Sequence, residues 1–223
     1  MGHAPVRVIT VEREYGSRGG EFAHDLAERL GWRLLDAELI NRAAQAAGVD
    51  PKTAARFDER LDPWYYRYGK LFWHDSSFSS IGMGEDHVFD SQRMLEIIKQ
   101  QILKAAKEGN CVIVGRGAQC ILQHKQDAFH VFVYAPLRER IERLKKRLET
   151  GADVEQRLRS VDGQRAKYLH QQFGRHWCDP HLYDLMLRST DDEEGAARVI
   201  LYAMTGAPVE SSKSSAVQVG CAG

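Results

Sequence analysis

The feature that most constrains the fold is an apolar, β-branched stretch at residues 6–11 that leads directly into a glycine cluster at residues 16–20. Phe22, Leu26 and Leu30 then recur at helical spacing. The pattern predicts a strand, a glycine-rich turn and a helix. Such a turn places backbone N–H groups at a helix N-terminus, where the helix dipole favours a phosphate group.

The same plan of strand and helix recurs along the chain. Further apolar strands are predicted at residues 32–35, 111–114, 129–134 and 185–187, and further helices from Leu39 and over residues 94–109, 137–148, 158–173 and 193–204. Alternating strands and helices favour a parallel sheet with helices on both faces. We therefore predict an α/β fold, with a parallel sheet of about five strands flanked by helices.

Composition excludes several classes of protein. The 223 residues carry 31 Lys+Arg and 31 Asp+Glu, and this balance argues against binding nucleic acid through bulk positive charge. No apolar run approaches the roughly 20 residues that span a bilayer, and the N-terminus does not resemble a signal peptide. Four scattered cysteines indicate reduced thiols. We expect a cytoplasmic protein with neither nucleic acid nor membrane as a partner.

The chain reads as one domain over residues 1–206, followed by a flexible tail rich in Ser, Gly and Ala at residues 207–223. One segment, residues 57–90, interrupts the rhythm of strands and helices with many aromatic residues. We interpret it as an insertion that covers a site or meets a partner, including a second copy of the chain.

On glycines alone, residues 16–20 are either a phosphate loop or a tight turn that needs positive φ. The surrounding residues decide, because they resemble the cytidylate kinase-like family of P-loop nucleoside monophosphate kinases. The resemblance covers nearly the whole chain to about Thr205. It is carried by Arg13, Glu14, Tyr15, Gly16, Ser17 and Gly19, by Leu30, Gly31, Asp36, Leu39 and Ile40, by residues 112–118, by Asp162, Arg165 and Tyr168, and by residues 183–187.

The resemblance implies a P-loop fold with an inserted acceptor region and a helical lid at residues 137–175. It implies ATP-dependent phosphoryl transfer to a nucleoside monophosphate, with CMP or dCMP as the expected acceptor and ATP and Mg²⁺ as cofactors. The nucleotide would be bound by the turn after the first strand, at Gly16, Ser17, Arg18, Gly19 and Gly20.

The turn departs from the standard phosphate loop. Gly19 stands where that loop has its lysine, and Gly20 and Glu21 follow, without the usual hydroxyl. Arg13 or Arg18 is a candidate for the missing positive charge, since arginine suits phosphate oxygens. Ser17 is a candidate for a weak Mg²⁺ ligand or a hydrogen-bond donor within the loop. The alternative function is a nucleotide-binding regulatory or sensor protein with weak or no kinase activity.

Three residues are candidates for the acceptor side. By the resemblance, Asp36 and Arg42 face the nucleoside monophosphate, whereas without it they read as a helix N-cap and an exposed helix position. Arg116 lies between two glycines after an apolar strand, at the edge where open α/β sheets bind ligands. The cytidylate kinase pattern often has an aspartate just before this Gly-Arg pair. Val114 stands there instead, so base selection by that carboxylate is not expected.

Arginines of residues 137–175 are candidates for the lid. Arg140, Arg143 and Arg165 would close over the transferring phosphoryl group, with Asp162 orienting them. The alternative is an exposed, charged helix surface with internal ion pairs. No set of protein metal ligands is predicted, because the spacing of the nearby His and Cys residues matches no zinc pattern: His170, His176, Cys178 and His181.

Overall fold

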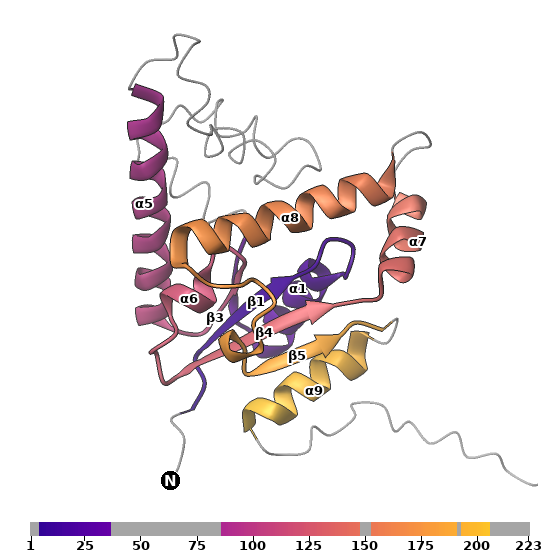
Figure 1. Cartoon of the computed structure of the whole chain (residues 1–223). Coiled ribbons are helices and arrows are strands. Elements are labelled where there is room, and N and C mark those ends of the chain that lie inside the picture. Colours follow the sequence, from indigo (N-terminus) through magenta and orange to yellow (C-terminus); the bar gives the residue numbers. More distant parts are fainter. Residues whose placement is uncertain (1–4, 37–85, 148–152, 191–192, 206–223) are drawn as a thin grey trace, which may run out of the picture.

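A computed structural model describes residues 5–36, 86–147, 153–190 and 193–205 (Figure 1). These residues form a sheet of five strands in the order β2-β3-β1-β4-β5, with every neighbouring pair parallel. The strands are β1 (Val8–Arg13), β2 (Arg33–Leu35), β3 (Cys111–Val114), β4 (Ala128–Tyr134) and β5 (Leu185–Arg188). The predicted fold class is confirmed.

Helices follow the strands as the sequence indicated. They are α1 (Gly19–Leu30), α5 (Asp86–Glu108), α6 (Ala118–Ile121), α7 (Leu137–Arg147), α8 (Val154–Phe173) and α9 (Glu193–Thr205), with a 3-10 turn η2 (Pro180–Leu182). Within the described ranges, no helix has the length and apolar character needed to cross a membrane.

Part of the predicted organisation lies outside the described residues: the helix from Leu39, residues 57–85 of the aromatic insertion, and the tail. The remaining residues of that insertion, 86–90, belong to helix α5, which begins at Asp86. The bounds of the predicted insertion stay a prediction. The hydrophobic spacing that predicted the helix begins only at Met94.

Strand β1 is buried on both faces, as expected for the centre of a parallel sheet. Ile9 and Val11 pack into a cluster with α1 and α9, and Val8 packs into a second cluster with α5, and all three side chains are fully buried. At roughly 1.5–3 kcal/mol for each buried aliphatic side chain, these contacts fix the position of β1. The first residue of the turn after β1 is therefore attached to a strand whose position is fixed by the core.

The strand order determines where a ligand site is expected. Strand β1 lies between β3 and β4, so the chain leaves the carboxyl ends of adjacent strands toward opposite sides of the sheet. Open α/β sheets bind ligands at such a switch point. Helix α8 lies along this end of the sheet, and two hydrogen bonds join it to the end of β1 and the residues that follow (Figure 1).

Candidate functional site

The turn after β1, residues 14–18, is closed by its own hydrogen bonds. Ser17 donates from its backbone N to the Glu14 carbonyl at 3.3 Å and from its hydroxyl to the same carbonyl at 2.9 Å. The hydroxyl also lies 3.1 Å from the Val133 carbonyl, and the residue is fully buried. Of the two roles expected for Ser17, the structure favours the donor within the loop over the Mg²⁺ ligand.

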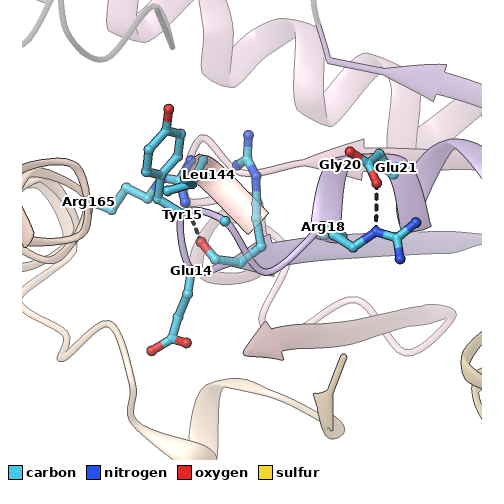
Figure 2. A pocket seen from close by; sticks show the side chains of 10 residues that line it. Glu14, Tyr15, Arg18, Gly20, Glu21, Leu144 and Arg165 are labelled. Atoms are coloured by element: carbon cyan, nitrogen blue, oxygen red, sulfur yellow. Dashed lines mark hydrogen bonds and ion pairs between the residues drawn. The ribbon is translucent and has the colours of Figure 1, made fainter. Parts of the chain in front are cut away.

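The N-terminus of α1 has no side chain that caps it. Its N-cap, Arg18, is left-handed at φ 65° and makes no side-chain capping bond. The first N–H groups of a helix have no partner within the helix, so this end of α1 is suited to an anion. The Arg18 guanidinium turns to Glu21 instead, with Nε donating to the carboxylate at 2.8 Å (Figure 2).

A pocket of about 210 Å³ lies over this turn (Figure 2). It is lined by the last residue of β1, the turn, the start of α1 and one residue each from α7 and α8: Arg13, Glu14, Tyr15, Gly16, Arg18, Gly19, Gly20, Glu21, Leu144 and Arg165. It thus brings together most of the predicted nucleotide-binding residues and three of the predicted catalytic arginines, Arg13, Arg18 and Arg165. Of the remaining candidates among the described residues, the lining does not include Ser17, Asp36, Arg116, Arg140, Arg143 or Asp162.

Arg165 is the arginine of α8 that reaches the pocket. Its side chain is buried, with 3% of the residue exposed, and it donates to the backbone carbonyl of Arg13. The predicted alternative, an exposed and charged helix surface, is not what the structure shows for Arg165. The sequence suggested that Arg165 reaches the site only when a lid closes, whereas here it already lies in the pocket.

Arg140, Glu14 and Asp162 form a group that we call the loop clamp. Arg140 Nε lies 3.3 Å from a Glu14 carboxylate oxygen, and Nη1 is paired with Asp162. The Glu14 carboxylate also accepts from Ala135 N at 3.0 Å, and Asp162 accepts from Tyr15 N at 2.8 Å. The clamp ties the turn after β1 to α7, α8 and the end of β4.

Within the loop clamp, Arg140 and Asp162 hold the turn after β1 in place. Asp162 was expected to orient Arg140, Arg143 and Arg165, and in the structure it pairs with Arg140. Burial raises the pKa of the Glu14 carboxyl, and the Ala135 N–H and the Arg140 charge partly offset the rise. Direct contact of Arg140 or Asp162 with a substrate stays a prediction.

Arg143 points toward the edge strand β5. It donates to the Ser189 hydroxyl at 3.0 Å and to Glu139 at 3.4 Å on its own helix. The spacing of Arg140, Arg143 and Arg147 suggested one stripe of arginines facing the site. The structure separates the first two, because Arg140 turns inward to the loop clamp while Arg143 turns to Ser189.

Arg116 occupies the carboxyl end of β3, as predicted. It is buried with 2% exposed, and its φ of 63° lies between those of Gly115 (68°) and Gly117 (67°). Such a conformation costs a non-glycine residue roughly 1–2 kcal/mol, and strained residues of this kind cluster at functional sites. The Tyr168 hydroxyl donates to the Arg116 carbonyl at 3.4 Å.

The other acceptor candidates lie near β2. Asp36 directly follows that edge strand and is half-buried, and Arg42 falls outside the described residues. Because Arg42 is not among the described residues, the shared role of the three acceptor candidates stays a prediction.

Sequence reasoning missed Glu12, the last fully buried side chain of β1. It is 2% exposed, and its carboxylate accepts from Arg13 N at 3.0 Å and lies 3.6 Å from Arg13 Nη1. The available signal was a carboxylate within an otherwise apolar strand, immediately before the glycine turn. A buried carboxylate needs a charged partner, and the neighbouring arginine supplies it.

The described residues contain no group of three or more His, Cys, Asp or Glu side chains able to hold a metal ion. His170 and His176 lie near each other, with ring centroids 5.8 Å apart. Cys111 and Cys120 are buried free thiols, and burial raises the pKa of each to about 11, so both stay protonated at neutral pH.

Comparison with solved structures supports the fold. An uncharacterized protein from Eubacterium ventriosum matches with a TM-score of 0.62 and 20% identity, over 89% of this chain and 98% of that one. Shikimate kinase from Acinetobacter baumannii, in complex with shikimate, matches with a TM-score of 0.50 and 14% identity over 90% and 94%. A gluconokinase from Sinorhizobium meliloti matches with a TM-score of 0.50 and 14% identity over 90% and 91%.

No curated protein sequence matches the chain significantly. The model of the cytidylate kinase-like family, however, matches residues 8–191. This match and the fold of P-loop kinases support a kinase-like phosphotransferase that uses a nucleotide. The chain belongs to the cytidylate kinase-like family.

Proposed function

We propose that the protein transfers a phosphoryl group from ATP, with Mg²⁺, to a nucleoside monophosphate, with CMP or dCMP as the preferred acceptor. The observation that carries the proposal is the pocket at the uncapped N-terminus of α1, whose lining includes Arg13 and Arg165. In a member of the cytidylate kinase-like family, this is the expected place for the phosphates of the donor.

The chemistry of phosphoryl transfer matches these groups. The reaction asks the protein mainly to position two substrates in line and to stabilise charge on the transferring oxygens. Backbone N–H groups at the start of α1 suit the phosphates, and buried guanidiniums act more strongly than exposed ones because water screens them less.

The pocket also fits Mg²⁺ bound through the nucleotide. Mg²⁺ usually keeps several waters and takes one or two carboxylates together with substrate phosphates. Of the two lining carboxylates, Glu14 belongs to the loop clamp, while the Glu21 side chain is 44% exposed and accessible to a hydrated ion. When bound, Mg²⁺ neutralises charge on the phosphates.

The acceptor is proposed to bind on the β3 side, near Arg116, with Asp36 and Arg42 as further contacts. Arg116 lies beside the end of β1 because β1 and β3 are paired up to Val11 and Val114. A guanidinium there suits the acceptor phosphate through two parallel hydrogen bonds.

A second function is favoured by one specific observation: among the residues that the structure describes, no lysine lines the pocket. A protein that binds a nucleotide without fast transfer would act as a sensor or regulator. Such a protein would bind ATP with ordinary affinity and show no acceptor-dependent formation of ADP.

The test is a screen of ADP formation from ATP and Mg²⁺ with each common nucleoside monophosphate, and with shikimate and gluconate as additional acceptors. We expect the highest kcat/KM with CMP or dCMP. A preference for shikimate or gluconate would overturn the nucleotide acceptor, and tight ATP binding without any acceptor-dependent turnover would favour the sensor.

A further inference from the structure

We propose that Arg13 replaces the missing lysine and contacts the transferring phosphoryl group from a slot between Gly19 and Gly115. The inference rests on the proposed function, since it names the group that acts on the phosphoryl in that same pocket. It also identifies which of the two candidate arginines, Arg13 or Arg18, supplies the charge.

The first wall of the slot is Gly19. A Cβ atom at this position would lie 2.4 Å from Arg13 Cβ and 2.9 Å from Arg13 Cγ, far closer than atoms can approach. The stem of Arg13 therefore fills the space that a side chain at residue 19 needs. A lysine at position 19 would therefore collide with Arg13 where it now lies. The same steric conflict explains why residue 19 is a glycine and why Arg13 can occupy this space.

The second wall is Gly115, at the end of β3. A Cβ there would lie 2.4 Å from Arg13 Nη1, and the backbone at this residue is left-handed with φ 68°. The Arg13 side chain thus runs from the start of α1 to the turn that carries Arg116. It lies between the proposed donor site and the proposed acceptor site, which is where a transferring phosphoryl group must pass.

The Arg13 guanidinium is positioned but keeps access to the pocket. Its Nη1 lies 3.6 Å from the Glu12 carboxylate. The Arg13 side chain remains 16% exposed and lines the pocket. Within the part of the chain that the structure describes, its buried Nη1 makes no hydrogen bond. A guanidinium has five N–H donors, so phosphate oxygens would supply acceptors that Glu12 alone cannot.

Arg18 is in a different situation. Its Nε donates to Glu21 on the first turn of α1, and its side chain is 27% exposed. Figure 2 shows this pair at the start of α1, away from Arg165. An exposed pair of this type is screened by water and contributes little. Arg18 is therefore a poorer substitute for the lysine than Arg13.

The first experiment compares Arg13→Gln and Arg13→Lys with Arg18→Gln, and with Arg159→Gln as a control, since Arg159 makes an exposed pair with Glu155 on α8. We expect kcat to fall roughly a hundredfold or more in Arg13→Gln, with partial recovery in Arg13→Lys. Thermal melting of each variant verifies folding. A normal kcat in Arg13→Gln, or a larger loss in Arg18→Gln, would overturn the inference.

A second experiment displaces the Arg13 guanidinium by a substitution at a neighbouring residue and leaves Arg13 itself unchanged. Gly115→Ala places a methyl group against Nη1, whereas Gly174→Ala puts alanine at a similar φ of 64° with nothing within 4 Å. Both carry the same backbone strain, so any greater loss of kcat in Gly115→Ala reports the displaced guanidinium. Equal kcat in the two variants would contradict the slot.

Calorimetry separates a failure of this inference from a failure of the proposed function. In the wild type, we expect ATP to bind more tightly than AMP, and Arg13→Gln to reduce that ratio at least tenfold, as for the loss of a strong charge-assisted contact. If the wild type binds ATP but transfers no phosphoryl group, both the proposed kinase activity and the transfer role of Arg13 are ruled out. If the wild type transfers the phosphoryl group, and Arg13→Gln keeps the same kcat and the same ratio of ATP to AMP affinity, only the role of Arg13 is ruled out.

Discussion

Arg140 on α7 and Arg165 on α8 are two buried arginines of the lid region, and their surroundings differ. Arg140 is 7% exposed and meets two carboxylates, Glu14 and Asp162. Arg165 is 3% exposed, donates to a backbone carbonyl and lines the pocket. Burial alone therefore does not identify the arginine that acts on a ligand.

The partners of each arginine indicate its role. The charge of Arg140 is balanced within the protein by the loop clamp, so its main effect is to fix the turn after β1. The charge of Arg165 faces a pocket that suits an anion, so its main effect is expected on the bound phosphates. The predictions below separate these two roles by measuring stability and catalysis independently.

The largest effect on stability is expected for Arg140→Ala. Removing one partner of a buried ion pair leaves the Glu14 and Asp162 carboxylates without their shared cation, and should lower the free energy of unfolding by about 3–5 kcal/mol. Urea unfolding measures this value. A loss below about 1 kcal/mol together with a collapse of kcat would instead place Arg140 in the catalytic machinery.

For Arg165→Ala we expect the reverse pattern. Losing one donor that stabilises the transition state should lower kcat roughly a hundredfold, with little change in ATP affinity. Arg165→Lys should recover only part of the rate, because a point charge does not reproduce the planar guanidinium. Steady-state kinetics of both variants provide the measurement, and a normal kcat in Arg165→Ala would return this residue to a structural role.

The loop clamp should also give stability a dependence on pH. The Glu14 pKa is raised above its usual 4.5 by burial, so the folded state holds this proton more tightly than the unfolded state. Stability is then greatest below pH 4.5 for this group, and falls as pH rises from 4.5 through the raised pKa. Neighbouring Arg140 opposes the shift and Asp162 adds to it.

Glu14→Gln removes this titration and tests it. The difference in free energy of unfolding between wild type and variant should decline as pH rises through that window. A difference that is constant with pH, or one that grows, would show that burial does not raise the pKa of the Glu14 carboxyl.

The smallest effect is expected for Arg143→Ala. This side chain bonds to Ser189 and Glu139 rather than lining the pocket, so stability should change by about 1 kcal/mol or less and kcat by only a few-fold. A hundredfold fall in kcat would show that Arg143 reaches the substrate during turnover, as the resemblance to the cytidylate kinase lid implied.

Much of the fold could be predicted because it depends on local patterns. Strands such as β3 are continuous apolar runs, and α7 and α8 repeat apolar residues at helical spacing. The short helix α6 and the turn η2 were missed, since elements of 4 and 3 residues are too short for any periodicity.

The site was predicted less completely because side-chain partners depend on distant residues. Sequence spacing placed Asp162 near Arg165 on one helix, but Asp162 pairs with Arg140, 22 residues away. Likewise, the carboxylate of Glu12 and the slot for Arg13 arise only where β1, β3 and α1 converge. The glycines were visible in the sequence, but not what each one contacts.

The transfer of the γ-phosphoryl group from ATP to CMP can be followed with a label. The full chain is mixed with Mg²⁺, CMP and ATP labelled at the γ-phosphate, and the labelled products are separated. We expect labelled CDP, formed in step with ADP and strongly reduced in Arg13→Gln and Arg165→Ala. Label that stays in ATP, or appears only as inorganic phosphate, would contradict transfer to the nucleotide.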